Sequence, residues 1–324
     1  MYFPAYYNEH ISAVIEAYQQ ARAQVKNGTG FVFLTDVHIA RNTRYSVPLI
    51  HYIKEHTDIQ NVLCGGDFVW AFGSANLCRE QLTLSLEYLD ALREDMNVYI
   101  ARGNHDATIR KSREEDVGYT MPYGQVRSAF AAHNSPATCA PEGKLYFYVD
   151  DTDAKIRYVI LDTSEKHLAE DQPWGVQYGM LDEQLRWLCD TALRLEDGRD
   201  WSVIVLGHIP CYEKITDAGS VLAPLRDILE AFRNKQCCQY GDFRNSKAEL
   251  VMYLAGHMHQ DLDAVSNGVL HIATGCDAYC VDDGMPRDVG TTNTVLFDVF
   301  LVDKDKKTVQ TFRVGAGESR KFDY

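Results

Sequence analysis

The chain has 324 residues, of which 46% are hydrophobic and 24% charged, so it can bury a large core and is neither a disordered segment nor a fibre. Its 32 basic and 46 acidic residues give a net charge of −14, which disfavours stable binding to nucleic acid or to an anionic membrane surface. No apolar run approaches the roughly 20 residues that span a bilayer, and the start of the chain does not resemble a signal peptide. Nine scattered cysteines without a C-x-x-C pair are typical of reduced thiols, so we expect a cytoplasmic protein.

The predicted elements begin with a helix over 5–26, where apolar residues recur at helical spacing. Short runs rich in β-branched and aromatic residues follow, and the early runs alternate with helical stretches at 46–57, 79–94 and 181–195. This alternation predicts a layered α/β protein with buried, largely parallel strands, and the last two runs predict a hairpin. The predicted strands are 31–35, 61–64, 97–101, 158–161, 201–206, 251–255, 269–273, 294–302 and 308–314.

Five of these strands end in polar residues that a buried strand does not need. In chain order they are Asp36-Val37-His38, Gly66-Asp67, Gly103-Asn104-His105-Asp106, Gly207-His208 and Gly256-His257-Met258-His259. Ligands of open α/β sheets bind beyond the carboxyl ends of the strands, so we expect these side chains to converge. Asp36 and His38 are two residues apart, as are His257 and His259, and in extended backbone this spacing places both side chains on one side.

The chemistry that these side chains suit is a site for two metal ions. Carboxylate, imidazole and amide oxygen together favour divalent ions such as Zn, Mn and Fe. A carboxylate such as Asp67 can bridge two ions about 3.5–4 Å apart, and the pair can hold both the attacking and the leaving oxygen of a phosphoryl displacement. Such ions also allow a protein of charge −14 to bind an anionic phosphate.

The five blocks resemble the calcineurin-like metallophosphoesterases, whose pattern is D-x-H, G-D, G-N-H-[ED], G-H and G-H-x-H. The resemblance runs from residue 31 to about 275, and it implies a four-layer α/β/β/α sandwich of two mixed sheets flanked by helices. It also implies two divalent metal ions (Mn, Fe or Zn). One ion would take Asp36, His38, Asp67 and His259, and the other would take Asp67, Asn104, His208 and His257. His105 corresponds to the family's catalytic histidine, which assists the leaving group while metal-bound hydroxide attacks phosphorus in line.

Two departures from the pattern narrow the subfamily. The Ser/Thr protein phosphatases of this superfamily read G-D-x-V-D-R-G and G-N-H-E, whereas here Asp67 is followed by Phe68-Val69-Trp70-Ala71 and the third block ends in Asp106. The aspartate that supports the catalytic histidine and the neighbouring phosphate-binding arginine are therefore missing. The resemblance favours the bacterial-type group, which hydrolyses cyclic nucleotides, other diesters or small monoesters. Diester and monoester both stay open, with a slight preference for the diester.

We expect a single domain over 1–324 with three specificity insertions, at about 107–157, 164–180 and 211–248. Aromatic and arginine side chains in these insertions could contact a substrate or pack the loops together, so no substrate-binding residue is predicted. Asp162 and Thr163 are interpreted as structural residues at the end of a strand. The histidines interpreted as structural are His10, His51, His56, His133, His167 and His271.

Two other functions stay open. A non-catalytic interaction module on the same fold, similar to the retromer subunit, has no need of a complete ligand set together with His105. A metal-dependent nuclease similar to the double-strand-break repair type needs a basic groove, which the net charge counts against. We expect a small phosphorylated substrate, no stable nucleic-acid partner and no membrane association. The natural substrate, the identity of the metals and the oligomeric state stay open.

Overall fold

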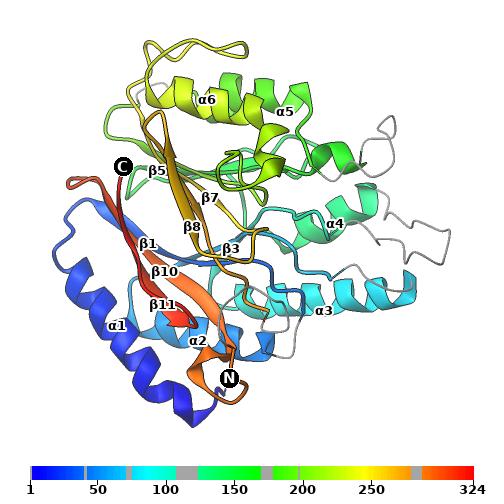
Figure 1. The fold of residues 1–324 in the computed structure, drawn as a ribbon, viewed down its shortest axis with the longest axis vertical. Helices are drawn as coiled ribbons and strands as arrows, with labels where there is room; N and C mark the ends of the chain where they lie inside the picture. The colour runs from blue at the N-terminus through cyan, green and yellow to red at the C-terminus, as the bar shows by residue number, and fades with distance from the viewer. Residues whose placement is uncertain are drawn as a thin grey trace.

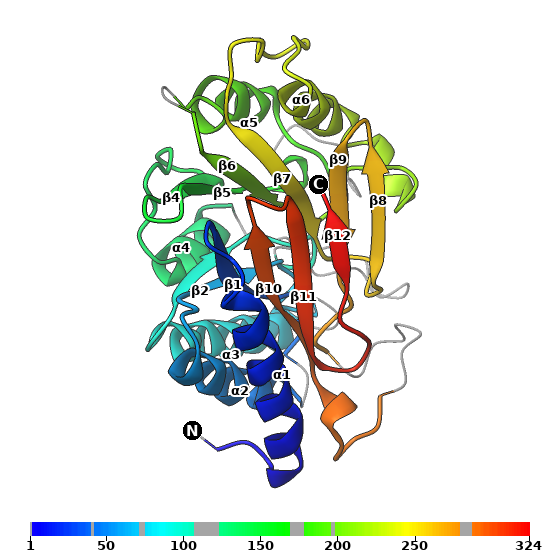
Figure 2. The same cartoon turned by 90° about the vertical axis from the view of Figure 1, so that its left-hand side faces the viewer.

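The computed structural model describes residues 2–39, 42–70, 75–106, 123–168, 178–195, 198–278 and 287–324. Within these ranges the strands form two six-stranded sheets, which Figure 2 shows one above the other. The first sheet contains β1 (Gly28–Leu34), β2 (Asn61–Cys64), β3 (Asn97–Ile100), β10 (Leu296–Asp303), β11 (Thr308–Gly315) and β12 (Lys321–Asp323). The second sheet contains β4 (Phe147–Asp151), β5 (Ile156–Ile160), β6 (Ser202–Leu206), β7 (Glu249–Ala255), β8 (Leu262–Ser266) and β9 (Val269–Ala273).

Both sheets are mixed. Their orders are β12-β11-β10-β1-β2-β3 and β4-β5-β6-β7-β9-β8. The pairs β1–β2, β2–β3, β5–β6, β6–β7 and β7–β9 are parallel, and the remaining five neighbouring pairs are antiparallel. The expectation of largely parallel strands is therefore wrong for the sheets as a whole. Four of the antiparallel pairs join strands that are consecutive in the chain, and the predicted hairpin β10–β11 is one of them. The fifth pairs β1 with β10, which returns to the first sheet from far along the chain.

Helices cover the outer face of each sheet. On the first sheet they are α1 (Asn8–Arg22), α2 (Thr43–His56), α3 (Ala75–Arg93) and α4 (Tyr123–His133), and on the second α5 (Asp182–Trp187) and α6 (Ala223–Arg233). Figure 1 shows these two groups on opposite sides of the paired sheets. Short 3-10 turns lie at Ala5–Tyr7, Glu165–Leu168, Asp217–Ser220 and Thr292–Thr294, and a π turn at Leu188–Ala192 extends α5. The order helix, sheet, sheet, helix confirms the four-layer sandwich.

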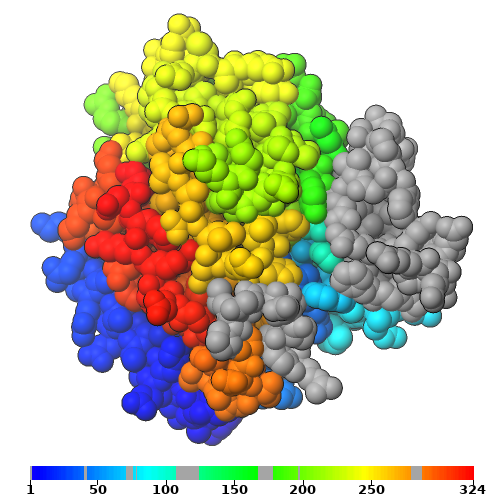
Figure 3. All heavy atoms as spheres, in the orientation of Figure 1, coloured from blue at the N-terminus to red at the C-terminus, as the bar shows by residue number. Residues whose placement is uncertain are grey.

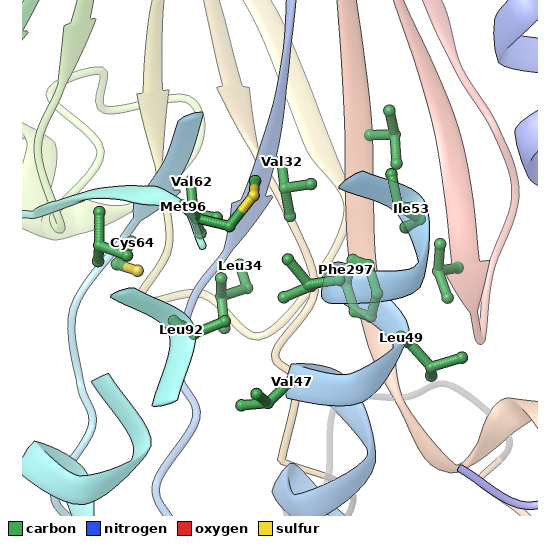
Figure 4. Close-up of a cluster of buried hydrophobic side chains, with 14 of the residues drawn as sticks. Val32, Leu34, Val47, Leu49, Ile53, Val62, Cys64, Leu92, Met96 and Phe297 are labelled. Atoms are coloured by element: carbon green, nitrogen blue, oxygen red, sulfur yellow. The ribbon is translucent and has the colours of Figure 1, made fainter. Parts of the chain in front are cut away.

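Three apolar cores hold the four layers together. Along β1, Val32 and Leu34 point toward α2 and α3, while Phe31 and Phe33 point between the sheets. Figure 4 shows the core under the first sheet, where side chains from β1, β2 and β10 meet those of α2 and the end of α3. A third cluster packs α5 and α6 on the outer face of the second sheet. A strand that is buried on both faces has an almost continuous run of apolar residues, and this is why these strands could be predicted from the sequence.

Sequence reasoning found most of these elements and missed others. The helix predicted over 5–26 begins with a 3-10 turn and ends at Arg22, where Ala23 continues into a turn. The elements α4, α6, β4, β8 and β12 were not predicted. The single domain and its three insertions remain predictions, and residues 107–122 and 169–177 of those insertions lie outside the described residues. No helix in the described ranges is both long enough and apolar enough to cross a bilayer.

Candidate metal centre

The polar residues predicted from sequence meet where the carboxyl ends of the parallel strands come together. Leu34 of β1 pairs with Cys64 of β2, and Cys64 pairs with Ile100 of β3, so the three strands of the first sheet end at one level. In the second sheet Leu206 of β6 pairs with Leu254 of β7. The loops that follow carry all eight predicted site residues, three of them from the second sheet: His208, His257 and His259.

Five of the seven predicted metal-binding residues have a left-handed backbone. The φ angles are 53° at Asp36, 46° at His38, 55° at Asp67, 68° at His257 and 56° at His259. The extended backbone expected for the two closely spaced pairs is therefore wrong, and their side chains converge through tight turns instead. Non-glycine residues in this region cost about 1–3 kcal/mol each and persist where the surroundings enforce them, most often at functional sites.

Two glycines allow the carboxylates to lie this deep. A Cβ atom at Gly103 would collide with Oδ1 and the backbone nitrogen of Asp67, and a Cβ at Gly256 would collide with Oγ1 of Thr35 and lie 2.5 Å from Oδ2 of Asp36. Both positions therefore require glycine for close approach rather than for backbone freedom. They explain why glycine precedes Asn104 and His257 in the sequence.

One group of ligand atoms lies around Asp36, which is fully buried. Its Oδ1 is 3.1 Å from Nε2 of His259, and its Oδ2 accepts hydrogen bonds from Oγ1 of Thr35 and the backbone nitrogen of His257. Nε2 of His38 lies 3.3 Å from Nε2 of His259 and 3.9 Å from Oδ1 of Asp36. Asp36, His38 and His259 together offer three ligand atoms within 4.8 Å of one another.

A second group lies around Asp67. Its Oδ2 is 3.1 Å from Nε2 of His208, while its Oδ1 accepts a hydrogen bond from the backbone nitrogen of His105. Oδ1 of Asn104 is 3.1 Å from Nε2 of His208 and 3.1 Å from Nδ1 of His257. Asp67 belongs to two sets of mutually close ligand atoms, one with His208 and His257 and one with His38 and His105.

Backbone carbonyls fix the orientation of three imidazoles. Nδ1 of His38 faces the carbonyl of Val69 at 3.2 Å, Nδ1 of His105 that of Trp70 at 2.7 Å, and Nδ1 of His208 that of Gly65 at 2.7 Å. A carbonyl only accepts, so each Nδ1 carries the proton in the neutral ring and each Nε2 presents its lone pair to the site. This is the arrangement of histidines that bind metals. Lone pairs and carboxylates then face one another, as in the contact between His38 and His259, and such a donor set fits divalent cations.

Burial and charge act in opposite directions on the pKa values of the site. Burial alone raises the pKa of Asp67, but the adjacent His208 holds it well below its usual range. His259 does the same for Asp36. Burial lowers the pKa of His208, but Asp67 outweighs it and raises that pKa to about 9. Burial lowers the pKa values of His38 and His257 to about 4. Positive charge between carboxylate and imidazole is thus favoured at two positions, whether a proton or a metal ion supplies it.

Asp106 braces the loops of the first sheet from within. Its buried carboxylate accepts hydrogen bonds from four backbone nitrogens, those of Gly103, Asp67, Phe68 and Val69, at 2.7–3.1 Å. These bonds tie the loop that carries Asp67 to the loop that carries Asn104 and His105. Sequence reasoning used Asp106 only to exclude a subfamily, although its place in the rare Gly-Asn-His-Asp block was a signal of its importance.

Two arginines connect the sheets beside the site. Arg102 donates to both carboxylate oxygens of Asp162, at 2.8 and 3.2 Å, and both side chains are buried. Arg313 of β11 donates to Asp298 of β10 at 2.9 Å and to Asp261 at 2.8 Å, two residues beyond His259. The interpretation of Asp162 as structural is consistent with this pairing. Sequence reasoning did not identify either arginine, because the partners lie 60 and 52 positions apart.

The other histidines lie outside the clusters of ligand atoms found among the described residues. His10 accepts a hydrogen bond from the backbone nitrogen of Gly315, and His271 stacks on Tyr212 with ring centroids 5.3 Å apart. His51 contacts Asp95 and the carbonyl of Ala91. These contacts agree with structural roles. The side chain of His167 lies outside the described residues.

Comparison with known proteins identifies a family. Residues 30–261 match the family model for calcineurin-like phosphoesterases, which covers all five blocks. None of the curated proteins matches the chain.

Similar solved structures include GAP50, the anchor in the inner membrane complex of Plasmodium, with 15% identity, TM-score 0.49 and coverage of 92% of this chain and 89% of that one. A putative 5′-nucleotidase from Staphylococcus aureus has 15% identity, TM-score 0.48 and coverage of 91% and 54%. Vacuolar protein sorting 29 from Cryptosporidium parvum has 13% identity, TM-score 0.34 and coverage of 92% and 100%. Because these TM-scores are all below 0.5, the structural similarities do not indicate the activity of this chain.

Proposed function

The chain belongs to the calcineurin-like phosphoesterase family, and on this premise we propose that it is an enzyme that holds two divalent ions and hydrolyses a small phosphodiester or phosphomonoester. The observation that carries the proposal is the position of Asp67. Its carboxylate lies close to His208 and His257, proposed ligands of one ion, and also to His38, a proposed ligand of the other, as a residue shared between two ions must. The family acts on phosphate esters, and the net charge of −14 favours a small phosphorylated substrate over nucleic acid.

The proposed ligands divide into two groups of four that share Asp67. Asp36, His38, Asp67 and His259 would hold one ion, and Asp67, Asn104, His208 and His257 would hold the other. Imidazole, carboxylate and amide oxygen suit Mn, Fe or Zn. Bound divalent ions supply a nucleophilic water at neutral pH and neutralise phosphoryl oxygens.

His105 is proposed to protonate the leaving oxygen. Its Nδ1–H is held by the carbonyl of Trp70, so Nε2, 4.0 Å from Oδ2 of Asp67, is the atom available to the substrate. The proton transferred would be the one that Nε2 carries in the doubly protonated imidazolium, which leaves the neutral ring with its proton on Nδ1. The His105 side chain is 15% exposed, whereas those of Asp67 and His208 are at most 1% exposed. A side chain at the open edge of the site, oriented by a fixed acceptor, can transfer a proton to a bound ester.

The support for His105 favours the bacterial-type group over the protein phosphatases. A main-chain carbonyl, that of Trp70, takes the place of the supporting aspartate. The nearby carboxylate of Asp106 accepts hydrogen bonds from four backbone N–H groups, which is a structural role. The choice between diester and monoester rests on the subfamily alone, with a slight preference for the diester.

The proposal is tested by assaying p-nitrophenyl phosphate beside bis-p-nitrophenyl phosphate, with Mn²⁺ and with a chelator, while the bound metal per chain is measured by mass spectrometry. We expect hydrolysis of at least one ester that the chelator abolishes and Mn²⁺ restores. Preference for the diester directs the search to cyclic nucleotides and other diesters, and preference for the monoester to nucleotidase or sugar-phosphatase chemistry. No hydrolysis of either ester by protein that holds two ions would contradict the proposal and favour an interaction module.

A further inference from the structure

Trp70 lies against two histidines of the proposed site. Its ring centroid is 4.5 Å from that of His38, with the ring planes at 83°, and 6.1 Å from that of His105, with the planes at 30°. The centroids of His38 and His105 are themselves 5.3 Å apart. One aromatic residue therefore contacts a proposed metal ligand edge-on and lies at a shallow angle to the proposed proton donor.

The position of Trp70 is fixed by the same main chain that orients those histidines. The carbonyl of Val69 accepts from His38, the carbonyl of Trp70 accepts from His105, and the nitrogen of Val69 donates to Asp106. Any movement of the segment around Trp70 would disturb both imidazoles. The indole is thus held in place before a ligand binds, which reduces the entropy lost on binding.

Trp70 lies near the open edge of the site. The His105 and His259 side chains are 15% and 19% exposed, whereas that of His38 is fully buried. Trp70 is half-buried, so packing on His38 leaves part of the indole accessible. The indole centroid is 6.1 Å from that of His105, so a substrate that presents its leaving oxygen to His105 has an aromatic ring within reach of the attached organic group.

We infer that Trp70 forms an aromatic wall for the organic group of the ester, so that the site prefers phosphate esters with a flat ring, such as aryl or nucleoside esters. The inference rests on the proposed function, because it takes the phosphoryl group to be held beside His105. Contacts between aromatic rings contribute about 0.5–1.5 kcal/mol beyond buried area, and stacking on a base contributes about 1–3 kcal/mol. A purely structural Trp70 would pack on His38 and leave ring preference unchanged.

Binding of non-hydrolysable phosphonates tests the inference without turnover. Phenylphosphonate, cyclohexylphosphonate and methylphosphonate share one anionic head, and the first two differ mainly in the flatness of the ring. Titration calorimetry on the manganese-loaded protein should show phenylphosphonate binding about 3- to 10-fold more tightly than cyclohexylphosphonate. Trp70→Leu should abolish this preference, and Trp70→Phe should keep most of it.

Two controls separate this effect from general damage. Trp201→Leu makes the same chemical change next to the amino end of β6, far along the strand from His208, and should leave the preference intact. Metal content and Tm of each variant are measured in parallel. A preference for phenylphosphonate that persists in Trp70→Leu overturns the inference.

The outcomes also separate this inference from the proposed function. If the manganese-loaded wild type binds no phosphonate and hydrolyses no test ester, both fail, and if it hydrolyses an ester without binding phenylphosphonate, only the inference fails. If test esters are hydrolysed but Trp70→Leu keeps the preference for phenylphosphonate, only the inference fails. If Trp70→Leu loses the preference while no ester is hydrolysed by any variant, the aromatic wall stands and the hydrolase proposal fails.

Discussion

The two sheets contribute different chemistry to the candidate metal centre. Loops of the first sheet supply both carboxylates, the amide and two imidazoles: Asp36, Asp67, Asn104, His38 and His105. Loops of the second sheet supply three imidazoles and no carboxylate: His208, His257 and His259. Negative charge therefore enters the site from one side, and the second sheet adds only imidazoles, of which His208 has a pKa raised to about 9 by Asp67.

The two halves are also held in different ways. Asp106 ties the loops of the first sheet to each other, so that half has a brace within its own sheet in addition to the Arg102–Asp162 pair between the sheets. The loop after β7 is held from across the sheets, by Arg313 on Asp261 and by Asp36 on the nitrogen of His257. Figure 3 shows the carboxy-terminal strands, in red, directly beside this part of the chain, in gold.

The two halves of the site therefore depend on each other unequally. The loop after β7 depends on contacts from the first sheet, so damage to the first half should spread to His257 and His259 as well. Damage to the second half should stay local. The following substitutions test that asymmetry.

Asp67→Asn should have the largest effect, because it removes the carboxylate shared by both groups of ligands. We expect both ions to be lost. Activity should fall by more than the factor of about 10 to 100 that follows removal of a residue that only supports a metal ligand. Metal content per chain and hydrolysis of test esters measure this. Asp95→Asn, at a carboxylate whose side chain is 54% exposed, is the matched control and should change neither. A variant that keeps two ions would show that Asp67 is not shared.

His105→Ala should lower kcat by about 10²- to 10⁴-fold while both ions stay bound, because this residue is proposed to move a proton rather than to hold metal. Activity and metal content are measured on the same sample. His133→Ala on α4, whose Nδ1 only contacts a carbonyl within its own helix, is the control. Full activity would remove His105 from the mechanism, and loss of metal would make it a ligand instead.

Asp106→Asn should weaken metal binding by about 10- to 100-fold, since an amide group replaces an oxygen that faces backbone N–H donors. Asp261→Asn makes the same change in the brace of the second half and should have a smaller effect, because Arg313 keeps its pairing with Asp298. Manganese affinity of both variants is compared by titration. Equal losses would contradict the asymmetry between the halves.

His271→Gln should have the smallest effect and concerns only acid stability. Burial lowers the pKa of His271 in β9 to about 4, so the folded chain keeps this ring neutral. The free energy of unfolding that the neutral ring contributes is fully present above the unfolded-state pKa of about 6.5. It is lost as pH falls from there to about 4, and the loss is at most about 3 kcal/mol. Denaturant unfolding of chelated protein at pH 7 and pH 4.5 measures the loss. Between pH 7 and pH 4.5 the variant should lose less unfolding free energy than wild type does. His56→Gln, at an exposed position on α2, should lose as much as wild type.

Sequence predicted the centre of the fold because buried strands are continuous apolar runs, and it predicted which side chains converge because they follow those strands. It did not predict how they converge. The left-handed backbone at Asp36 and His257 is enforced by surrounding contacts. Aspartate and histidine adopt this conformation more often than most residues, but so weak a preference does not show where in the chain it occurs. Short, partly exposed strands such as β8 and β12 carry little apolar pattern. The partners of Arg102 and Arg313 lie far away in sequence. The ion pairs that hold the loops of the site could therefore be identified only in the packed structure.

The division of ligands between the sheets also has a consequence for folding. The chain builds β1 to β3, then all of the second sheet, and only then returns to the first sheet with β10. Asp36 and His38 meet His259, and Asp67 meets His208 and His257, only once the sheets have docked. Although the first sheet alone supplies Asp36, His38 and Asp67, neither sheet alone completes either group of four ligands, so binding of both ions should follow docking during refolding. The rate at which manganese is captured would then report on the last step of assembly.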